Sequence, residues 1–506
     1  MSQYKIRLVY STVINYFSLI YRLLTSILFS VIIARELSPK EFGLWGVILS
    51  LVTTLSTPIM IWVYWMQRYF ARGFKRATGT GLILTLAYCS LATGIYLYLI
   101  ELQKNIFGWD VRHLVWGVPF LLLNLLHNYG MSVASVSKPE LRGFCISVYN
   151  TLRLCVLALF LFLGGSHIDL IVVIMVNAFA LLLSNIYLYL SLILVGALNY
   201  SFDLNLVLEW FKGSFVPGFN TVYNMLSRYI RVAVSWLSGS EAPAAYLNIA
   251  FSSGAPLLQT SHAAMPALYA KILREKRGGD VENAFRLFVI LSGFLFPSLI
   301  LLSKPIATLY NPEYLEAHVL VELFTVYTLI LGVQNLCFVI IQGSIDVDRY
   351  GIGSVRQVLK SYLVKSYLLK LIGISIAYSL IFALIPVVKE DYLLESVIAI
   401  IALVIGTLAV LPFFYRIASQ NVSYRLPWRE VKASIVAACF IFIYYTLSGA
   451  RNVVVTNLLA DSQILITHAV VALAIYIATE YVLSPWTRRI INKELGKLLK
   501  LSEKDL

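Results

Sequence analysis

Apolar runs of about 20 residues recur along the whole chain, and short polar connections separate them. A run of this length forms a helix that crosses the roughly 30 Å of hydrocarbon in a bilayer. The connections are too short to hold a catalytic domain, so the pattern predicts an all-α polytopic membrane protein. The runs predict fourteen transmembrane helices, near residues 9–33, 43–66, 79–100, 114–135, 145–164, 168–195, 214–238, 245–270, 286–303, 318–341, 363–386, 393–415, 433–449 and 464–484.

Composition and charge support a membrane protein. The chain has 506 residues, of which 59% are hydrophobic and 13% charged, about half the charged fraction of a soluble protein. The basic runs RYFARGFKR (68–76), KILREKR (271–277) and TRRIINKELGKLLK (487–500) fall on one side of the membrane. The positive-inside rule therefore predicts a cell-membrane protein with both termini in the cytoplasm. The same bias explains the net charge of +14, so no nucleic-acid partner is needed to account for it.

The cysteines do not predict a disulfide framework or a metal site. They show no CxxC spacing and no accompanying histidine cluster, so the sequence predicts no metal and no cofactor. All five lie in or beside apolar runs: Cys89, Cys145, Cys155, Cys337 and Cys439.

Polar stripes follow three of the predicted helices. Residues in one stripe recur at steps of three, four and seven, which places them on one helical face. A polar stripe within a membrane must face other helices or water, because lipid cannot satisfy its hydrogen bonds. The stripes predict a substrate-binding cavity lined by Asn15 and Arg22 of the first helix, Asn224, Arg228 and Arg231 of the seventh, and Gln259 and His262 of the eighth.

The arginines suggest what the cavity binds. The first, second, seventh and eighth predicted helices contain no Asp or Glu, so Arg22 and Arg228 lack obvious ion-pair partners there. Unpaired arginines favour an anionic cargo such as a phosphate or pyrophosphate. Arg231 lies nearer a helix end. Two interpretations are equally supported for it: that it binds the cargo, or that its side chain snorkels to the membrane interface. For His262, hydrogen-bonded packing is favoured slightly over titration during transport.

An internal repeat indicates two halves. Shifted by 200 positions, Leu37, Ser38 and Glu41 coincide with Leu237, Ser238 and Glu241, in equivalent connections after the first and seventh helices. We therefore predict an N-terminal six-helix half (1–198), a C-terminal six-helix half (199–416), and two extra helices with a basic amphipathic tail (417–506). Repeats of this kind are typical of transporters that bind substrate between their halves.

The connection after the first helix also carries a family resemblance. FSVIIARELSPKEFGLWGVILSL resembles oligosaccharide flippases of the multidrug/oligosaccharidyl-lipid/polysaccharide (MOP) superfamily, whose pattern is roughly A-R-x-L-G-P-x-x-[FY]-G. The segment KPIATLYNPEYLEA (304–317) resembles the family's loop after its ninth helix, whereas Ser38 stands where glycine is usual. The residues that match the pattern are Ala34, Arg35, Leu37, Pro39, Phe42 and Gly43.

The resemblance implies a flippase that translocates a prenyl-phosphate- or pyrophosphate-linked glycan across the bilayer by alternating access. Membrane lipids are expected partners, and a coupling ion and glycan-assembly enzymes are left open. The aromatic run WVYWMQRYF (62–70) suits an interfacial belt better than a platform for sugar rings.

Two alternatives belong to other functional classes. A cation-coupled multidrug antiporter shares the superfamily layout, but it needs carboxylates where this chain has arginines. A membrane enzyme acting on lipid-linked sugars would need a metal–nucleotide site, for which Asp346-x-Asp348 is the one candidate. No nucleotide-binding pattern surrounds that pair, so we interpret it as a solvated turn and predict that the chain is not an enzyme.

Overall fold

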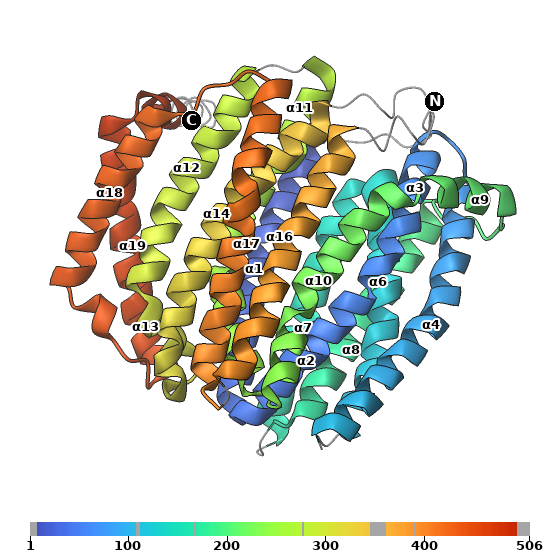
Figure 1. Ribbon diagram of the computed structural model, residues 1–506, viewed down its shortest axis with the longest axis horizontal. Helices are drawn as coiled ribbons and strands as arrows, with labels where there is room; N and C mark the ends of the chain where they lie inside the picture. Colours follow the sequence, from blue (N-terminus) through green and yellow to red (C-terminus); the bar gives the residue numbers. More distant parts are fainter. Residues whose placement is uncertain are drawn as a thin grey trace, which may run out of the picture. The chain divides into compact units, whose positions relative to one another are not determined.

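A computed structural model of the chain describes residues 8–107, 112–164, 168–275, 278–344, 361–388 and 390–492. These residues are almost entirely helical and include no β-strand (Figure 1). The predicted all-α class is confirmed. The Asp346-x-Asp348 pair lies outside the described residues, and so does the basic tail beyond residue 492.

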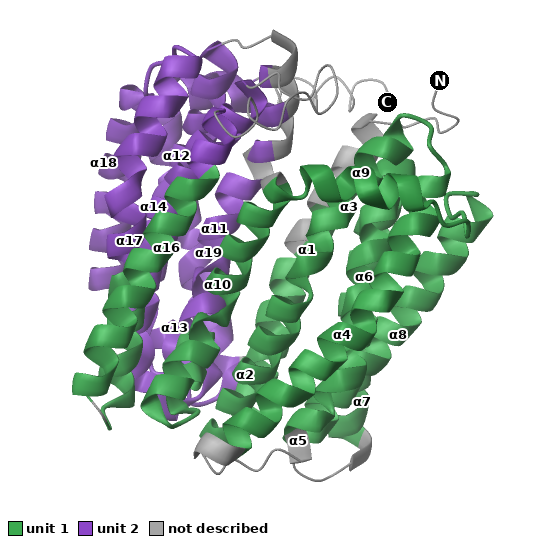
Figure 2. Ribbon diagram, turned by 45° about the vertical axis from the view of Figure 1, so that its right-hand side comes forward, with its two compact units in different colours: residues 1–248, 352–360, 367–402 green, residues 249–351, 361–366, 403–506 purple. Residues whose placement is uncertain are grey.

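The chain divides into two compact units (Figure 2). Unit 1 comprises residues 1–248, 352–360 and 367–402. Its helices are α1 (Leu8–Glu36), α2 (Pro39–Leu55), α3 (Met60–Ala71), α4 (Arg76–Phe107), α5 (Arg112–Val115), α6 (Gly117–Ser137), α7 (Pro139–Gly164), α8 (Leu170–Leu194), α9 (Leu204–Gly213), α10 (Phe215–Ser238), most of α16 (Tyr362–Leu384) and the starts of α11 (Ala242–Glu275) and α17 (Tyr392–Asn421). Short 3-10 turns cover Thr57–Ile59 and Ile385–Val387.

Unit 2 comprises residues 249–351, 361–366 and 403–506. It holds the remainders of α11 and α17, together with α12 (Gly278–Leu301), α13 (Ser303–Tyr310), α14 (His318–Ser344), α18 (Trp428–Leu447) and α19 (Leu458–Leu483). Short 3-10 turns cover Pro312–Ala317 and Ala450–Asn452. The halves predicted at 1–198 and 199–416 remain a prediction. The two units are defined by which residues pack together, and this does not test whether the two halves repeat each other.

Ten helical segments of the described chain are long and apolar enough to cross a membrane. The four other long helices are α1, α6, α10 and α11, which brings the number of long segments to the fourteen predicted. Two of these four, α6 and α10, carry polar side chains that line the cavity described below. The polar residues of α6 and α10 therefore face a cavity and not lipid. With its ten apolar spans, the chain is a polytopic membrane protein.

Several helices extend beyond the apolar runs that predicted them. The run 145–164 lies within α7, which begins at Pro139, and the run 286–303 corresponds to α12, which begins at Gly278. The run 43–66 is one span, Pro39–Ala71, interrupted by a 3-10 turn around Pro58. Hydropathy detects the part of a helix within the hydrocarbon, whereas the end turns also contain polar residues. The short helices α9 and α13 were not predicted.

In unit 1, α2 packs closely against α10 and the start of α11. A Cβ on Gly43 would lie 2.3 Å from the Glu241 carbonyl oxygen, so only glycine permits this approach. One turn later, Gly46 lies against the side-chain amide of Asn248. That amide is held on both sides: its Oδ1 accepts from Arg231 Nη1 at 2.7 Å, and its Nδ2 donates to the Phe42 carbonyl at 3.2 Å.

In unit 2, a buried carboxylate connects α18 to α19. The Glu480 side chain is 1% exposed and accepts hydrogen bonds from three hydroxyls. Ser434 donates at 2.6 Å and Tyr476 at 3.2 Å to Oε1, and Thr487 donates at 3.4 Å to Oε2. The single Tyr476 O–H is shared with the Ile290 carbonyl of α12, whose oxygen lies 2.7 Å from the hydroxyl, so the network includes a third helix.

Candidate functional site

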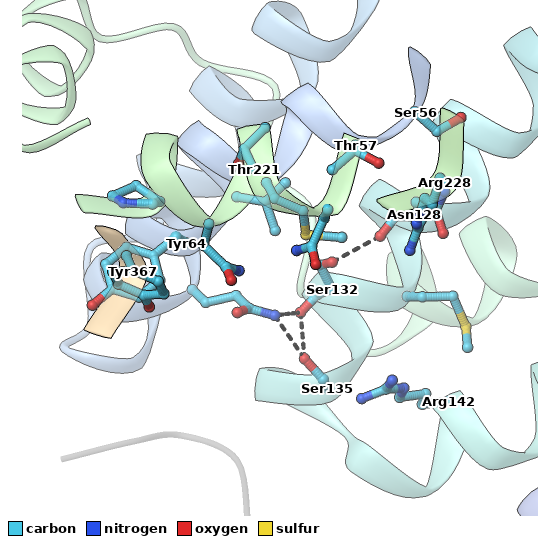
Figure 3. A pocket seen from close by; sticks show the side chains of 17 residues that line it. Ser56, Thr57, Tyr64, Asn128, Ser132, Ser135, Arg142, Thr221, Arg228 and Tyr367 are labelled. Atoms are coloured by element: carbon cyan, nitrogen blue, oxygen red, sulfur yellow. Dashed lines mark hydrogen bonds between the residues drawn. The ribbon is translucent and has the colours of Figure 1, made fainter. Parts of the chain in front are cut away.

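A polar cavity of about 430 Å³ lies within unit 1. Its wall comes from α3, α6, α7, α10 and α16, together with the turn that separates α2 from α3 (Figure 3). The lining residues are Ser56, Thr57, Met60, Val63, Tyr64, Gln67, Asn128, Met131, Ser132, Ser135, Arg142, Pro217, Asn220, Thr221, Asn224, Arg228 and Tyr367.

Two arginines give the cavity its charge. Arg142 of α7 and Arg228 of α10 are both exposed, and both side chains belong to the lining (Figure 3). None of the lining residues is an aspartate or glutamate. Among the described residues, neither arginine has a carboxylate within 4.0 Å. The cavity is therefore cationic, with no internal counter-charge.

Arg228 is anchored to α2 through the backbone. Its Nη1 donates to the Thr53 carbonyl at 3.1 Å, and its own carbonyl accepts a hydrogen bond from the Ser50 hydroxyl. A guanidinium carries five N–H donors, so one bond to Thr53 leaves most of them for a ligand. The anchor fixes the position of the charge without neutralising it.

Two further arginines lie beside the cavity without lining it. Arg22 of α1 is half-buried and close enough to Arg142 for the two charges to repel each other. Arg231 is likewise close enough to Arg228 for their two charges to repel each other. Its guanidinium donates a hydrogen bond to Asn248 where α2 packs against α10. Four guanidiniums thus concentrate positive charge in this part of unit 1.

Amides and hydroxyls form much of the remaining wall. Gln67 Nε2 donates to the Ser132 carbonyl at 3.0 Å and to the Ser135 hydroxyl at 2.9 Å, which connects α3 to α6. Tyr64 lines the same cavity, with the Arg68 guanidinium 4.4 Å from the centre of its ring. One member of the aromatic run 62–70 therefore faces the cavity.

The structure brings together some of the predicted site residues. Asn224 and Arg228 line the cavity, and Arg22 and Arg231 lie next to lining residues. Asn15 belongs to α1, but its side chain is not among those described. Whether any of these residues binds substrate remains a prediction.

The remaining predicted residues, Gln259 and His262, belong to α11 within unit 2. Gln259 is half-buried and His262 is exposed. Their role in binding also remains a prediction.

Sequence reasoning missed Arg142. The predicted helix began at residue 145, which left Arg142 in a connection, whereas α7 begins at Pro139 and carries Arg142 in its first turn. Proline is favoured at the first position of a helix, so Pro139 was an available signal for the earlier start. Asn128 and Ser132, one turn apart on α6, were a second missed polar stripe.

Comparison by sequence identifies no relative: no family model matches the chain, and no curated protein matches it. Comparison of structures does find similar proteins. The lipid II flippase MurJ in an inward closed conformation has a TM-score of 0.61 at 13% identity, covering 96% of this chain and 100% of that one. An inward-facing multidrug resistance MATE transporter of the MOP superfamily has a TM-score of 0.56 at 12% identity, covering 79% and 94%.

A third similar structure is a MOP superfamily transporter from Pyrococcus furiosus, with a TM-score of 0.52 at 12% identity. It covers 82% of this chain and 95% of that one, and its binding pocket is described as having reversed polarity that suggests a different function. These similar proteins are transporters and flippases rather than enzymes. From the fourteen long helices and these three likenesses together, the chain has the fold of the MOP superfamily transporters.

Proposed function

We propose that this protein is a flippase that translocates a prenyl-phosphate- or pyrophosphate-linked oligosaccharide from the cytoplasmic to the outer leaflet. The observation that carries the proposal is the cavity of unit 1, which presents Arg142 and Arg228 and no carboxylate. A planar guanidinium binds phosphate oxygens in pairs, and a pyrophosphate offers enough oxygens for two arginines. A cation entering this cavity would meet repulsion instead.

The cavity also suits the other part of such a cargo. Sugars are recognised through hydrogen bonds. The amides of Asn128, Asn220 and Asn224 supply donors and acceptors along the wall, and the side-chain carbonyl of Gln67 supplies an acceptor. The prenyl chain has no place among these groups and would stay in the bilayer beside the helices. The cargo is thus divided according to polarity, with the phosphate at the arginines and the glycan along the amides.

The mechanism that we propose is alternating access with both termini in the cytoplasm. The basic runs predict that orientation, which places the end of α3 near the inner leaflet. In a conformation open to the cytoplasm, the phosphate displaces water from Arg142 and Arg228. A rearrangement of the two halves then exposes the cargo to the other side of the membrane.

The second candidate function is a cation-coupled multidrug antiporter. The likeness to MATE transporters supports it as well as the likeness to MurJ supports a flippase, since both show the fold alone. The sign of the cavity charge favours the flippase, because a cationic drug needs carboxylates to replace its hydration. Reversed pocket polarity in the Pyrococcus furiosus transporter indicates that pocket polarity differs among proteins of this fold.

The test is transport of a fluorescent prenyl-pyrophosphate glycan in proteoliposomes, with wild type compared with Arg142→Ala and Arg228→Ala. Each charged hydrogen bond contributes about 1.5 to 3 kcal/mol, so each variant is expected to reduce transport at least tenfold. Arg451→Ala is the matched control, because Arg451 is exposed on the connection before α19 in unit 2. Wild-type rates in both cavity variants would refute the proposal. Exchange of a cationic dye for protons, with no glycan transport, would establish the antiporter.

A further inference from the structure

The short helix α9 is apolar on two adjacent sides, one buried and one exposed, and polar on the remaining side. Leu206, Val207 and Trp210 are buried in unit 1, at 7%, 7% and 2% exposure. The other side exposes Leu204, Leu208 and Phe211, at 59%, 54% and 67%. Their spacing of four and three residues forms one continuous stripe. An exposed apolar stripe on a helix beside transmembrane segments is suited to lie in the membrane interface.

The segment that leads into α9 is held tightly against α4. Gly79 makes this possible, because a Cβ there would lie 2.4 Å from the Ser201 carbonyl oxygen. The hydroxyls of the two flanking threonines accept backbone N–H groups: Thr78 from Asn199 at 3.1 Å, and Thr80 from Asp203 at 3.0 Å. The position of α9 beside α3 and α4 is therefore fixed (Figures 1 and 2).

A small apolar cavity of about 100 Å³ lies between α9, α3 and α4. Phe211 joins the exposed stripe to this cavity, because its side chain lines the cavity and is also the most exposed of the stripe. Trp210 lines the cavity too, and its buried indole N–H has no hydrogen-bond partner. Such a donor costs free energy unless a ligand accepts from it. The lining residues are Ile61, Trp62, Leu84, Tyr88, Val207, Trp210, Phe211 and Ser214.

Basic side chains outnumber acidic ones around this surface, where α9 also exposes Glu209. Arg72 and Lys75 are exposed in the turn between α3 and α4, and Lys212 is exposed in the last turn of α9. The helices on either side of this turn contact α9 and the residue before it: the Tyr69 ring of α3 lies 6.1 Å from that of Trp210, and Arg76 at the start of α4 pairs with Asp203 at 3.9 Å. Three cations thus stand next to an apolar stripe and an apolar cavity.

We propose that α9, this cavity and the basic turn form a binding site for one anionic phospholipid of the bilayer. An acyl chain lies along Leu204, Leu208 and Phe211 and enters the cavity, and an ester carbonyl accepts from the Trp210 N–H. The phosphate and an anionic headgroup bind Arg72, Lys75 and Lys212. The site is separate from the cavity with Arg142 and Arg228 and does not depend on the identity of the cargo.

The test uses the full-length protein in detergent and the quenching of tryptophan fluorescence by brominated lipids. Brominated phosphatidylglycerol is compared with brominated phosphatidylcholine, which has the same acyl chains and no net charge. Wild type is expected to bind phosphatidylglycerol more tightly, by about fivefold for each cation that takes part. The triple variant Arg72→Gln, Lys75→Gln, Lys212→Gln is expected to lose this preference.

Two further variants keep the result interpretable. Arg429→Gln with Lys432→Gln removes exposed charges from α18 in unit 2 and should retain the preference. Trp210→Phe removes the N–H and one of the quenched tryptophans, so binding is read from the lipid concentration that half-quenches the remaining tryptophans, among them Trp62 of the cavity wall. This variant should weaken binding of both lipids. Equal binding of the two lipids by wild type would overturn the proposal, as would an unchanged preference in the triple variant. Displacement of the brominated lipid by a prenyl pyrophosphate but not by phosphatidylglycerol would also overturn it and assign the site to the cargo.

Discussion

Gly46→Ala is expected to break the packing of α2 against α10 at one defined point. A Cβ at position 46 would lie 2.0 Å from Nδ2, 2.7 Å from Cγ and 2.7 Å from Oδ1 of Asn248. The entire amide is within 3.0 Å, so a small rotation cannot relieve the overlap. The amide must leave, and its hydrogen bonds with Arg231 and the Phe42 carbonyl are lost together.

The expected cost follows from those two bonds. The bond to a charged guanidinium contributes about 1.5 to 3 kcal/mol and the neutral one about 0.5 to 1.5 kcal/mol. Gly46→Ala should therefore lower the free energy of unfolding by about 2 to 4.5 kcal/mol. Asn248→Ala removes the same two bonds and should cost a similar amount. The double variant should cost no more than either single change, because the alanine at 248 leaves room for the new methyl group.

The assay is equilibrium unfolding in mixed detergent micelles, applied to wild type, both single variants and the double variant. Gly94→Ala on α4 is the matched control, since a Cβ there meets nothing within 4 Å and alanine favours a helix. Wild-type stability of Gly46→Ala would show that α2 and α10 move apart freely. Additive costs in the double variant would show that the two residues act independently, which would refute the reasoning.

Three other predictions test separate parts of the fold and site. Gly79→Ala should detach the 199–203 segment from α4, because the new methyl group overlaps the Ser201 carbonyl. Limited proteolysis should then cleave this segment faster than in wild type, and an unchanged rate would contradict the close approach. Glu480→Ala should lower the free energy of unfolding by about 1 to 3 kcal/mol, because buried hydroxyls lose their acceptor; a stability equal to that of wild type would show that the network contributes nothing. Arg142→Lys should transport glycan faster than Arg142→Ala and slower than wild type, because lysine keeps the charge and loses the paired geometry; equal rates for lysine and alanine would show that charge alone is not what Arg142 supplies.

The sequence predicts the helices well and their ends poorly. Each apolar run corresponds to a long helical segment, interrupted in one case by a 3-10 turn, because a spanning segment must match the thickness of the bilayer. The ends lie in water or headgroups, where hydropathy carries no signal, so α7 began six residues earlier than its run. The helix α9 was missed for a related reason. Its ten residues are too few to span a bilayer, and which of its apolar residues are buried depends on packing against α3 and α4.

The candidate site could be predicted only in part. Asn224 and Arg228 lie one turn apart on one helix, so periodicity alone places them on the same face. Arg142 comes from another helix, and its proximity to Arg228 in the cavity wall depends on tertiary packing that no local pattern encodes. The contact that Asn248 makes could not be predicted from the sequence for the same reason. It belongs to the polar stripe of α11, yet its amide is used entirely in the contact between α2 and α10.

The low apolar content of α10 has a consequence for how the chain enters the membrane. Arg228 lies near the centre of this helix and Arg231 nearer its end; together they oppose insertion by up to about 5 to 7 kcal/mol, and the leucine, isoleucine, valine and phenylalanine residues return only about 3 to 5 kcal/mol. Taken alone, α10 would not partition from the translocon into lipid. It must be retained until α2, made earlier, offers the Thr53 carbonyl to Arg228. Biogenesis of this protein is therefore cooperative, and a change in α2 can appear as a failure to insert a helix made more than 150 residues later.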